Sequence, residues 1–416
     1  MSVRDLPVRP DLGQLKRQAK ELLRALRARD PAAVALLRDH HPRAIDPAAT
    51  ILADAQLALA RSYGVPSWPR LVLACRMTDA IWRYDVRSVR ELILRNPELL
   101  HESATGRAKS NWGPPMSYAA NVGADDVIAA LRELGASDVQ FAFERAALQG
   151  RIATARRLIA MGARPVRGSV MGPCETLNPD GLAFLLENGA EFADEHGNRL
   201  APIALLLQTY SRGPEMKHRC LEIVERRGVV FPDTPPMALH RGRLDLIETH
   251  LRRDPALFSR TYAHAEIYPP ELGCAADASL GLHGTPLAGA TLLHVAVDFD
   301  ELPLARWMLE RGADVNARAA LDDDGFGGHT ALFGSVVSQA YRCGLDEDAA
   351  FAHLLLDAGA DPNVRASLRK RLRFTDDGAL HEYHDVTPRS WGERFHDEDW
   401  VNPAALQAIA DAGGMP

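Results

Sequence analysis

Apolar residues recur at helical spacing near the start of the chain, and basic residues occupy the opposite side of the same helix. The apolar set is Leu12, Leu15, Ala19, Leu22, Leu23 and Leu26. Similar segments cover residues 32–38, 51–63 and 70–75, and Gly64 ends one of them. The pattern predicts a helical N-terminal segment over residues 1–76.

After this segment, a leucine-rich helix that ends in Gly-Ala recurs along the chain. Its copies are at 131–136, 158–163, 185–190, 308–317 and 355–364, with a weaker copy at 409–413. A second phrase, Thr-Leu-Leu-His-Val-Ala at 291–296, has partial copies that begin at Thr330 and Thr387. Each helical pair of this kind leaves an apolar face that only its neighbours cover, so the repeats predict an all-α stack.

The order Thr-x-Leu-His-x-Ala, followed by a helix ending Leu-Leu-x-x-Gly-Ala-Asp-x-Asn, resembles the ankyrin repeat. The likeness is strong over residues 291–317, good over 330–365, moderate over 115–190, and weak over 201–260 and 387–413. The resemblance implies an all-α ankyrin-repeat solenoid of stacked helix-turn-helix units behind an N-terminal helical cap. It also implies protein–protein recognition through the concave face and the finger loops.

Within this resemblance, some residues have structural rather than binding roles. The threonines cap first helices, the histidine links neighbouring units, the alanine allows close packing, and the glycines end second helices. The aspartates and asparagines favour the turns that follow. The set is Thr291, His294, Ala296, Gly312, Asp314, Asn316, Thr330, Gly359, Asp361 and Asn363.

The spacing of the repeats is irregular. Gly135 and Gly162 lie 27 residues apart, whereas Gly312 and Gly359 lie 47 apart, on either side of the family period of about 33. The late units therefore carry insertions, which predict long fingers. We divide the chain into a basic helical segment (1–76), degenerate ankyrin-like repeats (77–260), an insertion (261–290) and better-matched repeats with long fingers (291–416).

Charge and cysteine usage narrow the classes of partner and compartment. The net charge is −7, yet residues 1–76 hold 13 basic and 7 acidic residues. An acidic body makes nucleic acid an unlikely partner, while the basic head keeps a nucleic-acid adaptor role open. Five dispersed cysteines argue against a disulfide framework.

The chain shows no apolar leader and no membrane-length segment, so we expect it to be cytoplasmic and not membrane-bound. The excess of 43 arginines over 5 lysines suggests a bacterial source.

Catalytic and cofactor motifs are missing from the sequence. It contains no Gly-Lys-Ser/Thr loop, no Gly-x-Ser-x-Gly elbow, no Gly-x-Gly-x-x-Gly loop and no His-Glu-x-x-His pair. We therefore expect no enzyme activity, no cofactor and no metal. One alternative is a small-ligand or catalytic pocket in the long C-terminal loops, built from His264, Asp298, His329, His381 and His384.

The expected partner is another protein, bound by residues of the fingers and inner helices. Aromatic and arginine side chains are the usual anchors of such surfaces. The candidate binding residues are Asp298, Phe299, Arg318, Asp322, Asp324, Phe326, Arg342, Arg365 and Trp391. The basic run of Arg369, Lys370, Arg371 and Arg373 is expected to pair with the acidic loops at 322–324 or 398–399.

Overall fold

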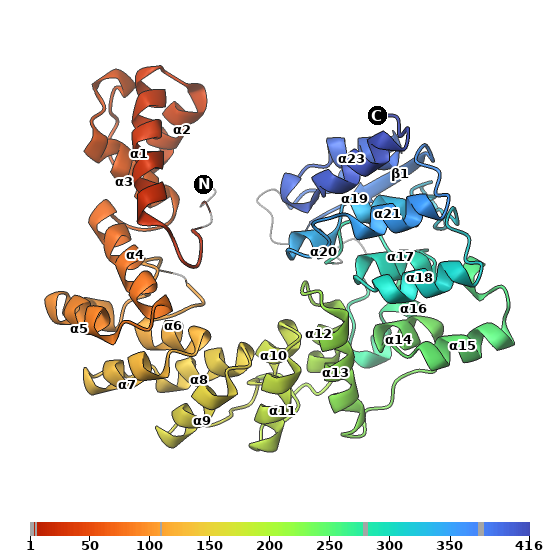
Figure 1. Cartoon of the computed structure of the whole chain (residues 1–416), viewed down its shortest axis with the longest axis horizontal. Helices are drawn as coiled ribbons and strands as arrows, with labels where there is room; N and C mark the ends of the chain where they lie inside the picture. Colours follow the sequence, from red (N-terminus) through yellow and green to blue (C-terminus); the bar gives the residue numbers. More distant parts are fainter. Residues whose placement is uncertain (1–3, 5, 109, 278–281, 373–377) are drawn as a thin grey trace. The chain divides into compact units, whose positions relative to one another are not determined.

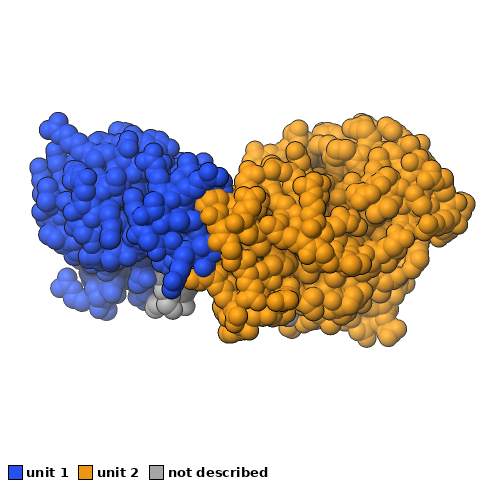
Figure 2. Space-filling model, turned by 90° about the horizontal axis from the view of Figure 1, so that it is seen from below, with its two compact units in different colours: residues 1–165 blue, residues 166–416 orange. Residues whose placement is uncertain are grey.

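A computed structural model describes residues 4, 6–108, 110–277, 282–372 and 378–416. The chain forms two compact units, residues 1–165 and residues 166–416, which Figure 2 shows in different colours. Residues 1–76 of the predicted division lie within unit 1, and residues 261–290 lie within unit 2; the predicted domain boundaries stay predictions. In the part of the chain that the structure describes, no helix is long and apolar enough to cross a membrane.

All regular secondary structure among the described residues of unit 1 is helical. Its α-helices are α1 (Leu12–Arg27), α2 (Pro31–His40), α3 (Leu52–Ser62), α4 (Trp68–Trp82), α5 (Val86–Arg95), α6 (Pro115–Val122), α7 (Asp125–Glu133), α8 (Val139–Leu148) and α9 (Ile152–Ala160). Helix α1 packs on α3, and α4 packs on α5 and α6. Short 3₁₀ turns occupy Pro47–Ala49 (η1) and Pro97–Leu100 (η2).

Side-chain caps and an apolar stripe explain the helical head of unit 1. The carboxylates of Asp11 and Asp30 and the hydroxyl of Ser67 accept backbone N–H groups at the starts of α1, α2 and α4. The buried face of α1 packs on Leu59 and Leu71 in one core cluster. The helices expected from the apolar spacing are therefore present in this region.

Unit 2 continues with helical pairs and adds two strands. Its α-helices are α10 (Met171–Glu175), α11 (Pro179–Glu187), α12 (Ala201–Gln208), α13 (Pro214–Glu225), α14 (Pro235–His240), α15 (Leu244–Arg253), α16 (His264–Ile267), α17 (Leu292–Asp298), α18 (Leu302–Glu310), α19 (Ala331–Val336), α20 (Gln339–Arg342), α21 (Ala350–Asp357), α22 (Pro388–Arg394) and α23 (Pro403–Asp411). Its 3₁₀ turns are η3 (Leu257–Ser259), η4 (Pro270–Leu272) and η6 (Glu398–Trp400).

The first helices of successive pairs in unit 2 stack directly on one another. Helix α17 packs between α14 and α19 (Figure 1), and α19 packs on α22. The second helices form a parallel row in which α21 contacts α18 and α23. The facing surfaces of the first helices α17, α19 and α22 are apolar and buried, as at Leu292, Leu332 and Trp391. The mostly helical, stacked architecture confirms the predicted fold class.

A small antiparallel sheet interrupts the helices of unit 2. Strand β1 (Ala366–Lys370) pairs with β2 (His381–Val386), with Leu368 opposite Tyr383. The hairpin is an element that the repeat pattern does not reveal. Arg373 of the basic run lies outside the described residues.

Polar side chains join neighbouring repeats. The imidazole of His294 bonds to the Thr291 hydroxyl at 2.8 Å and to the carbonyl of His329 in the next repeat at 3.0 Å. The Asn316 side chain donates to the Gly359 carbonyl at 3.0 Å and accepts from the Asp361 amide at 2.8 Å. These contacts link one helical pair to the next.

The remaining repeat residues have local roles. Ala296 is buried without exposed surface. Gly312 and Gly359 follow α18 and α21 with φ of +85° and +91°, which glycine adopts at little cost. The carboxylates of Asp314 and Asp361 accept the amides of Asn316 and Asn363 in the turns. Thr330 starts α19, but its hydroxyl has no hydrogen-bond partner among the described residues, so it does not cap that helix.

Acid should destabilise unit 2 through its buried histidines. Burial lowers the pKa of His294 to about 4 and the pKa of His329 to about 3, while an unfolded histidine titrates near 6.5. Below about pH 6.5 the unfolded chain therefore binds more protons, and the free energy of unfolding falls by roughly 1.4 kcal/mol per pH unit for each histidine. Urea unfolding measured between pH 7 and pH 4.5 should show this decline, and the variant His329→Asn should show a shallower one. A decline that is equally steep in His329→Asn would contradict the assignment.

Candidate functional site

Unit 2 contains a cavity of about 690 Å³ on the finger side of the repeats. Its wall comes from described residues of three segments: the insertion at 261–290, the finger at 319–329, and strand β1 together with Leu380. We call this cavity the finger pocket. Its lining residues are Thr261, Tyr262, Ala263, His264, Glu266, Pro286, Ala288, Gly289, Ala320, Leu321, Asp322, Phe326, Gly327, His329, Leu368, Arg369 and Leu380.

Backbone hydrogen bonds hold the insertion against the finger. The Tyr262 amide donates to the Ala290 carbonyl, and the Gly289 amide donates back to the Tyr262 carbonyl, both at 2.9 Å. The Ala320 amide then donates to the Gly289 carbonyl at 2.8 Å. Because backbone groups make these links, the first wall of the pocket is a built element rather than a loose loop.

The finger is a tight turn that joins the β-hairpin. Within it, the Asp322 amide donates to the Phe326 carbonyl at 2.8 Å. The Gly327 amide donates to the Ser367 carbonyl of β1 at 2.7 Å. Gly327 has φ of +125°, and a Cβ there would lie 2.2 Å from the Ala320 carbonyl oxygen, so only glycine fits.

Arg369 clamps the finger from the hairpin side. Its guanidinium donates to the carboxylates of Asp322 at 2.7 Å and Asp324 at 2.8 Å, and it lies over the Phe326 ring at 4.9 Å. The pairing of the basic run with the 322–324 loop, which the sequence favours, is therefore present. Each exposed ion pair contributes little alone, but the shared arginine fixes two carboxylates and a ring in one arrangement.

The mouth of the finger pocket is apolar. Leu321 keeps 65% of its surface exposed and Leu380 keeps 41%, whereas Leu368 and Tyr262 of the same pocket are buried. Water-exposed leucines beside a cavity form the kind of patch that marks a binding surface.

Two histidines bring polar atoms to the same wall. The Nε2 atoms of His329 and His264 bond to the carbonyls of Pro286 and Ala275, both at 2.9 Å. Each Nε2 therefore carries the proton, and each Nδ1 is an acceptor with no partner among the described residues. Burial keeps the His329 ring uncharged.

A buried polar cluster lies elsewhere in unit 2 and was not found by sequence reasoning. Arg212 pairs with the Asp298 carboxylate at 2.7 Å and also donates to the Asp298 carbonyl at 2.8 Å. The Lys217 ammonium lies 3.6 Å from the centre of the Phe299 ring and 2.7 Å from Nδ1 of His240. We call these five residues the buried polar cluster.

Burial sets the protonation of this cluster. It raises the pKa of Asp298, which Arg212 opposes, and it lowers the pKa of Lys217 and the pKa of His240 well below their usual values. His240 ends the segment Pro-Pro-Met-Ala-Leu-His at residues 235–240, which is a partial copy of the Thr-Leu-Leu-His phrase. Its imidazole bonds to the Ile267 carbonyl at 2.9 Å, just as the imidazole of His294 bonds to the His329 carbonyl. That phrase is the one sequence signal for the cluster.

The structure separates the predicted binding residues into different places. Asp322 and Phe326 line the finger pocket, and Asp324 is joined to it through Arg369. Asp298 and Phe299 are interior residues of the buried polar cluster.

The other predicted binding residues lie away from the pocket lining. Trp391 is fully buried and donates to the Thr285 hydroxyl at 3.1 Å. Arg318 bonds to the carbonyls of Gly328 and Arg365 at the base of the finger. Arg365 pairs with Asp385, and Arg342 pairs with Asp399 on the surface.

The residues of the alternative ligand or catalytic pocket do not converge. His264 and His329 share the finger pocket, but Asp298 is paired with Arg212. His381 stacks on His396 at 3.8 Å, and His384 lies beside the Phe326 ring. Within the described residues, no group of three or more His, Cys, Asp or Glu side chains is arranged to hold a metal ion.

Comparisons with known proteins bear on the family. The ankyrin repeat family model matches residues 288–320, which include the strongest phrase of the sequence. A search of curated proteins finds none that matches the chain. The chain is similar to the crystal structure of the human ASB11 ankyrin repeat domain, with 18% identity and a TM-score of 0.25, over 73% of this chain and 99% of that one. The family match over residues 288–320 confirms the predicted resemblance to the ankyrin repeat.

Breaking the Arg212–Asp298 pair should destabilise unit 2 strongly. In Asp298→Ala the guanidinium stays buried without its counter-charge, and the free energy of unfolding should fall by about 3–5 kcal/mol. The double variant Arg212→Met with Asp298→Ala removes both charges and should recover much of this loss. Urea unfolding followed by fluorescence measures both.

The exposed pair of Arg342 and Asp399 provides the matched control. Arg342→Ala should change stability by less than about 1 kcal/mol. If Asp298→Ala cost no more than Arg342→Ala, the buried pair would not have the structural role described here.

Proposed function

We propose that this chain binds another protein through the finger pocket, which receives a large apolar side chain of the partner. Ankyrin repeats are generally protein–protein interaction modules. The observation that carries the proposal is the exposure of Leu321 and Leu380 beside a cavity that Pro286 and Leu368 also line. Covering these leucines would remove apolar surface from water, at about 25 cal/mol per Å².

The order of the finger supports a recognition role. The Gly327–Ser367 backbone bond and the ion pairs of Arg369 fix the loop in the unbound protein. A binding loop that is already ordered loses less conformational entropy on association. A modest contact area can then give useful affinity.

The partner should place basic groups near its apolar anchor. Glu266 and Asp322 line the pocket, and Asp323 and Asp324 lie on the same finger, whereas the arginines bonded to these segments are Arg260, Arg318 and Arg369. These side chains sum to one net negative charge. Charges at a rim act mainly on association rate and specificity, so they select the partner more than they hold it.

We propose a function that involves no catalysis, no cofactor and no nucleic acid. Ankyrin repeats are typically non-catalytic. The five cysteine thiols are free, which supports residence in the cytoplasm, where thiols stay reduced. A peptide with an apolar anchor and basic flanks fits this account better than a phosphate backbone does.

Selection of randomised displayed peptides on the full chain tests this function. The selected peptides should share one large apolar residue with basic neighbours. Their affinity should fall about tenfold or more for Leu321→Asp and for Leu380→Asp, because a carboxylate at the mouth prevents apolar burial.

Leu94→Asp is the matched control, since Leu94 is 68% exposed on α5 in unit 1. This variant should bind the peptides as the unaltered chain does. Failure to select any peptide, or equal loss for all three variants, would contradict recognition through the finger pocket. Selected peptides without an apolar residue would contradict the anchor.

A further inference from the structure

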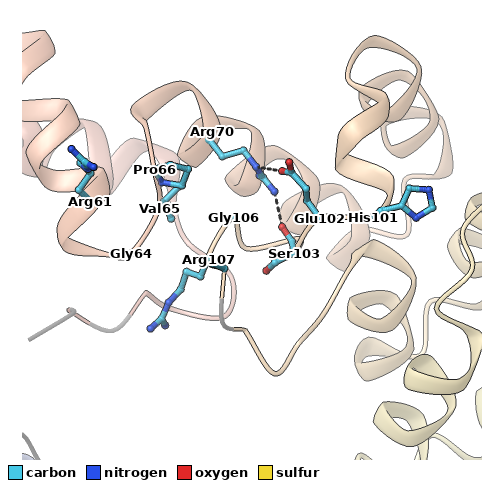
Figure 3. Close-up of a pocket in the computed structure, with 11 residues that line it drawn as sticks. Arg61, Gly64, Val65, Pro66, Arg70, His101, Glu102, Ser103, Gly106 and Arg107 are labelled. Atoms are coloured by element: carbon cyan, nitrogen blue, oxygen red, sulfur yellow. Dashed lines mark hydrogen bonds and ion pairs between the residues drawn. The ribbon is translucent and has the colours of Figure 1, made fainter. Parts of the chain in front are cut away.

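Unit 1 contains a second cavity, of about 780 Å³, that the recognition of a protein by unit 2 does not use (Figure 3). One side comes from the end of α3 and the turn into α4, and the other from the segment after η2. Its lining residues are Arg61, Gly64, Val65, Pro66, Arg70, His101, Glu102, Ser103, Gly106, Arg107 and Ala108. We call it the arginine pocket.

Positive charge dominates the arginine pocket. Arg61, Arg70 and Arg107 line it from three parts of the sequence, against the single lining carboxylate of Glu102. Residues 1–76 add their excess of basic residues to the field around it. The formal charge of the lining side chains is therefore positive by two, with histidine neutral.

Arg70 is held in place before any ligand arrives. Its Nε donates to the Glu102 carboxylate at 2.9 Å, and its Nη2 donates to the Ser103 carbonyl at 2.6 Å (Figure 3). These bonds use two of its three nitrogens and leave Nη1 beside Gly106, where a Cβ would lie 3.3 Å away. A fixed guanidinium with a remaining N–H edge is well suited to an oxyanion.

The backbone around the pocket favours an anion in the same way. Helix α4 has 15 residues and begins at Trp68, two residues after Pro66, so its N-terminal partial positive charge adds to that of the arginines. Gly64 and Gly106 have φ of +74° and +75° on the two sides of the pocket. Glycine at these turns lets the two segments approach, and a Cβ on Gly106 would press on Val65 at 3.2 Å.

We propose that the arginine pocket binds a small molecule that carries a phosphate or pyrophosphate group. The three arginines line one cavity from its two sides rather than forming a track along a helix. The basic face of α1, which a nucleic-acid backbone would follow, is not part of the lining. A cavity of this volume is within the usual range for small ligands.

Calorimetric titration of the full chain with inorganic pyrophosphate tests the proposal. Pyrophosphate should bind in a saturable manner that weakens as salt rises. In the double variant Arg61→Ala with Arg107→Ala, the affinity should fall about tenfold or more. Arg70→Lys, which keeps the charge and loses the fixed fork, should also bind more weakly.

The control is Arg87→Ala with Arg95→Ala, which removes the same charge from the exposed face of α5. It should leave the affinity unchanged, and both double variants should keep the melting temperature of the unaltered chain, which separates lost binding from lost folding. No saturable binding, or equal loss in the control, would overturn the proposal. A single-stranded DNA oligonucleotide that binds more tightly than pyrophosphate, and depends on the same arginines, would overturn the small-molecule assignment in favour of nucleic acid. None of these results touches the finger pocket.

Discussion

A pair of short antiparallel helices cannot cover its own apolar face, so each repeat of unit 2 depends on its neighbours for burial. Stacking in turn places backbone carbonyls of one repeat against the next, and each needs a donor. His294 and His240 supply one by bonding across to the carbonyls of His329 and Ile267. Asn316 does the same at the turns. Apolar burial holds the stack together, and these polar links fix its spacing.

The finger pocket exists because insertions extend from a stack that is already rigid. The 261–290 insertion and the finger at 319–329 meet through backbone bonds, and Arg369 reaches from the hairpin to clamp the finger. Leu321 and Leu380 are then held in water rather than collapsed into the core. Keeping apolar surface exposed in an ordered element costs stability, and binding a partner would recover that free energy.

Sequence alone predicts the repeating units, because Thr-x-Leu-His and Gly-Ala-Asp-x-Asn are local signals. It also names the finger residues Asp322 and Phe326 as binding candidates, and both line the pocket. The inward direction of Asp298 is not predictable, because its partner Arg212 is 86 residues away. The hairpin was missed because Lys370 is buried in β1, so a charged residue occupies an inward position and hides the strand alternation.

We infer that the finger is ordered before any partner binds. Hydrogen exchange of the full chain at the amides of Asp322, Gly327 and Gly328 tests it most directly, since these amides donate to the carbonyls of Phe326, Ser367 and Ala319. We expect slow exchange at all three amides, at rates comparable to those of amides in the neighbouring helices. Exchange at the rate of an unstructured peptide would show that the finger pocket does not exist in the free protein.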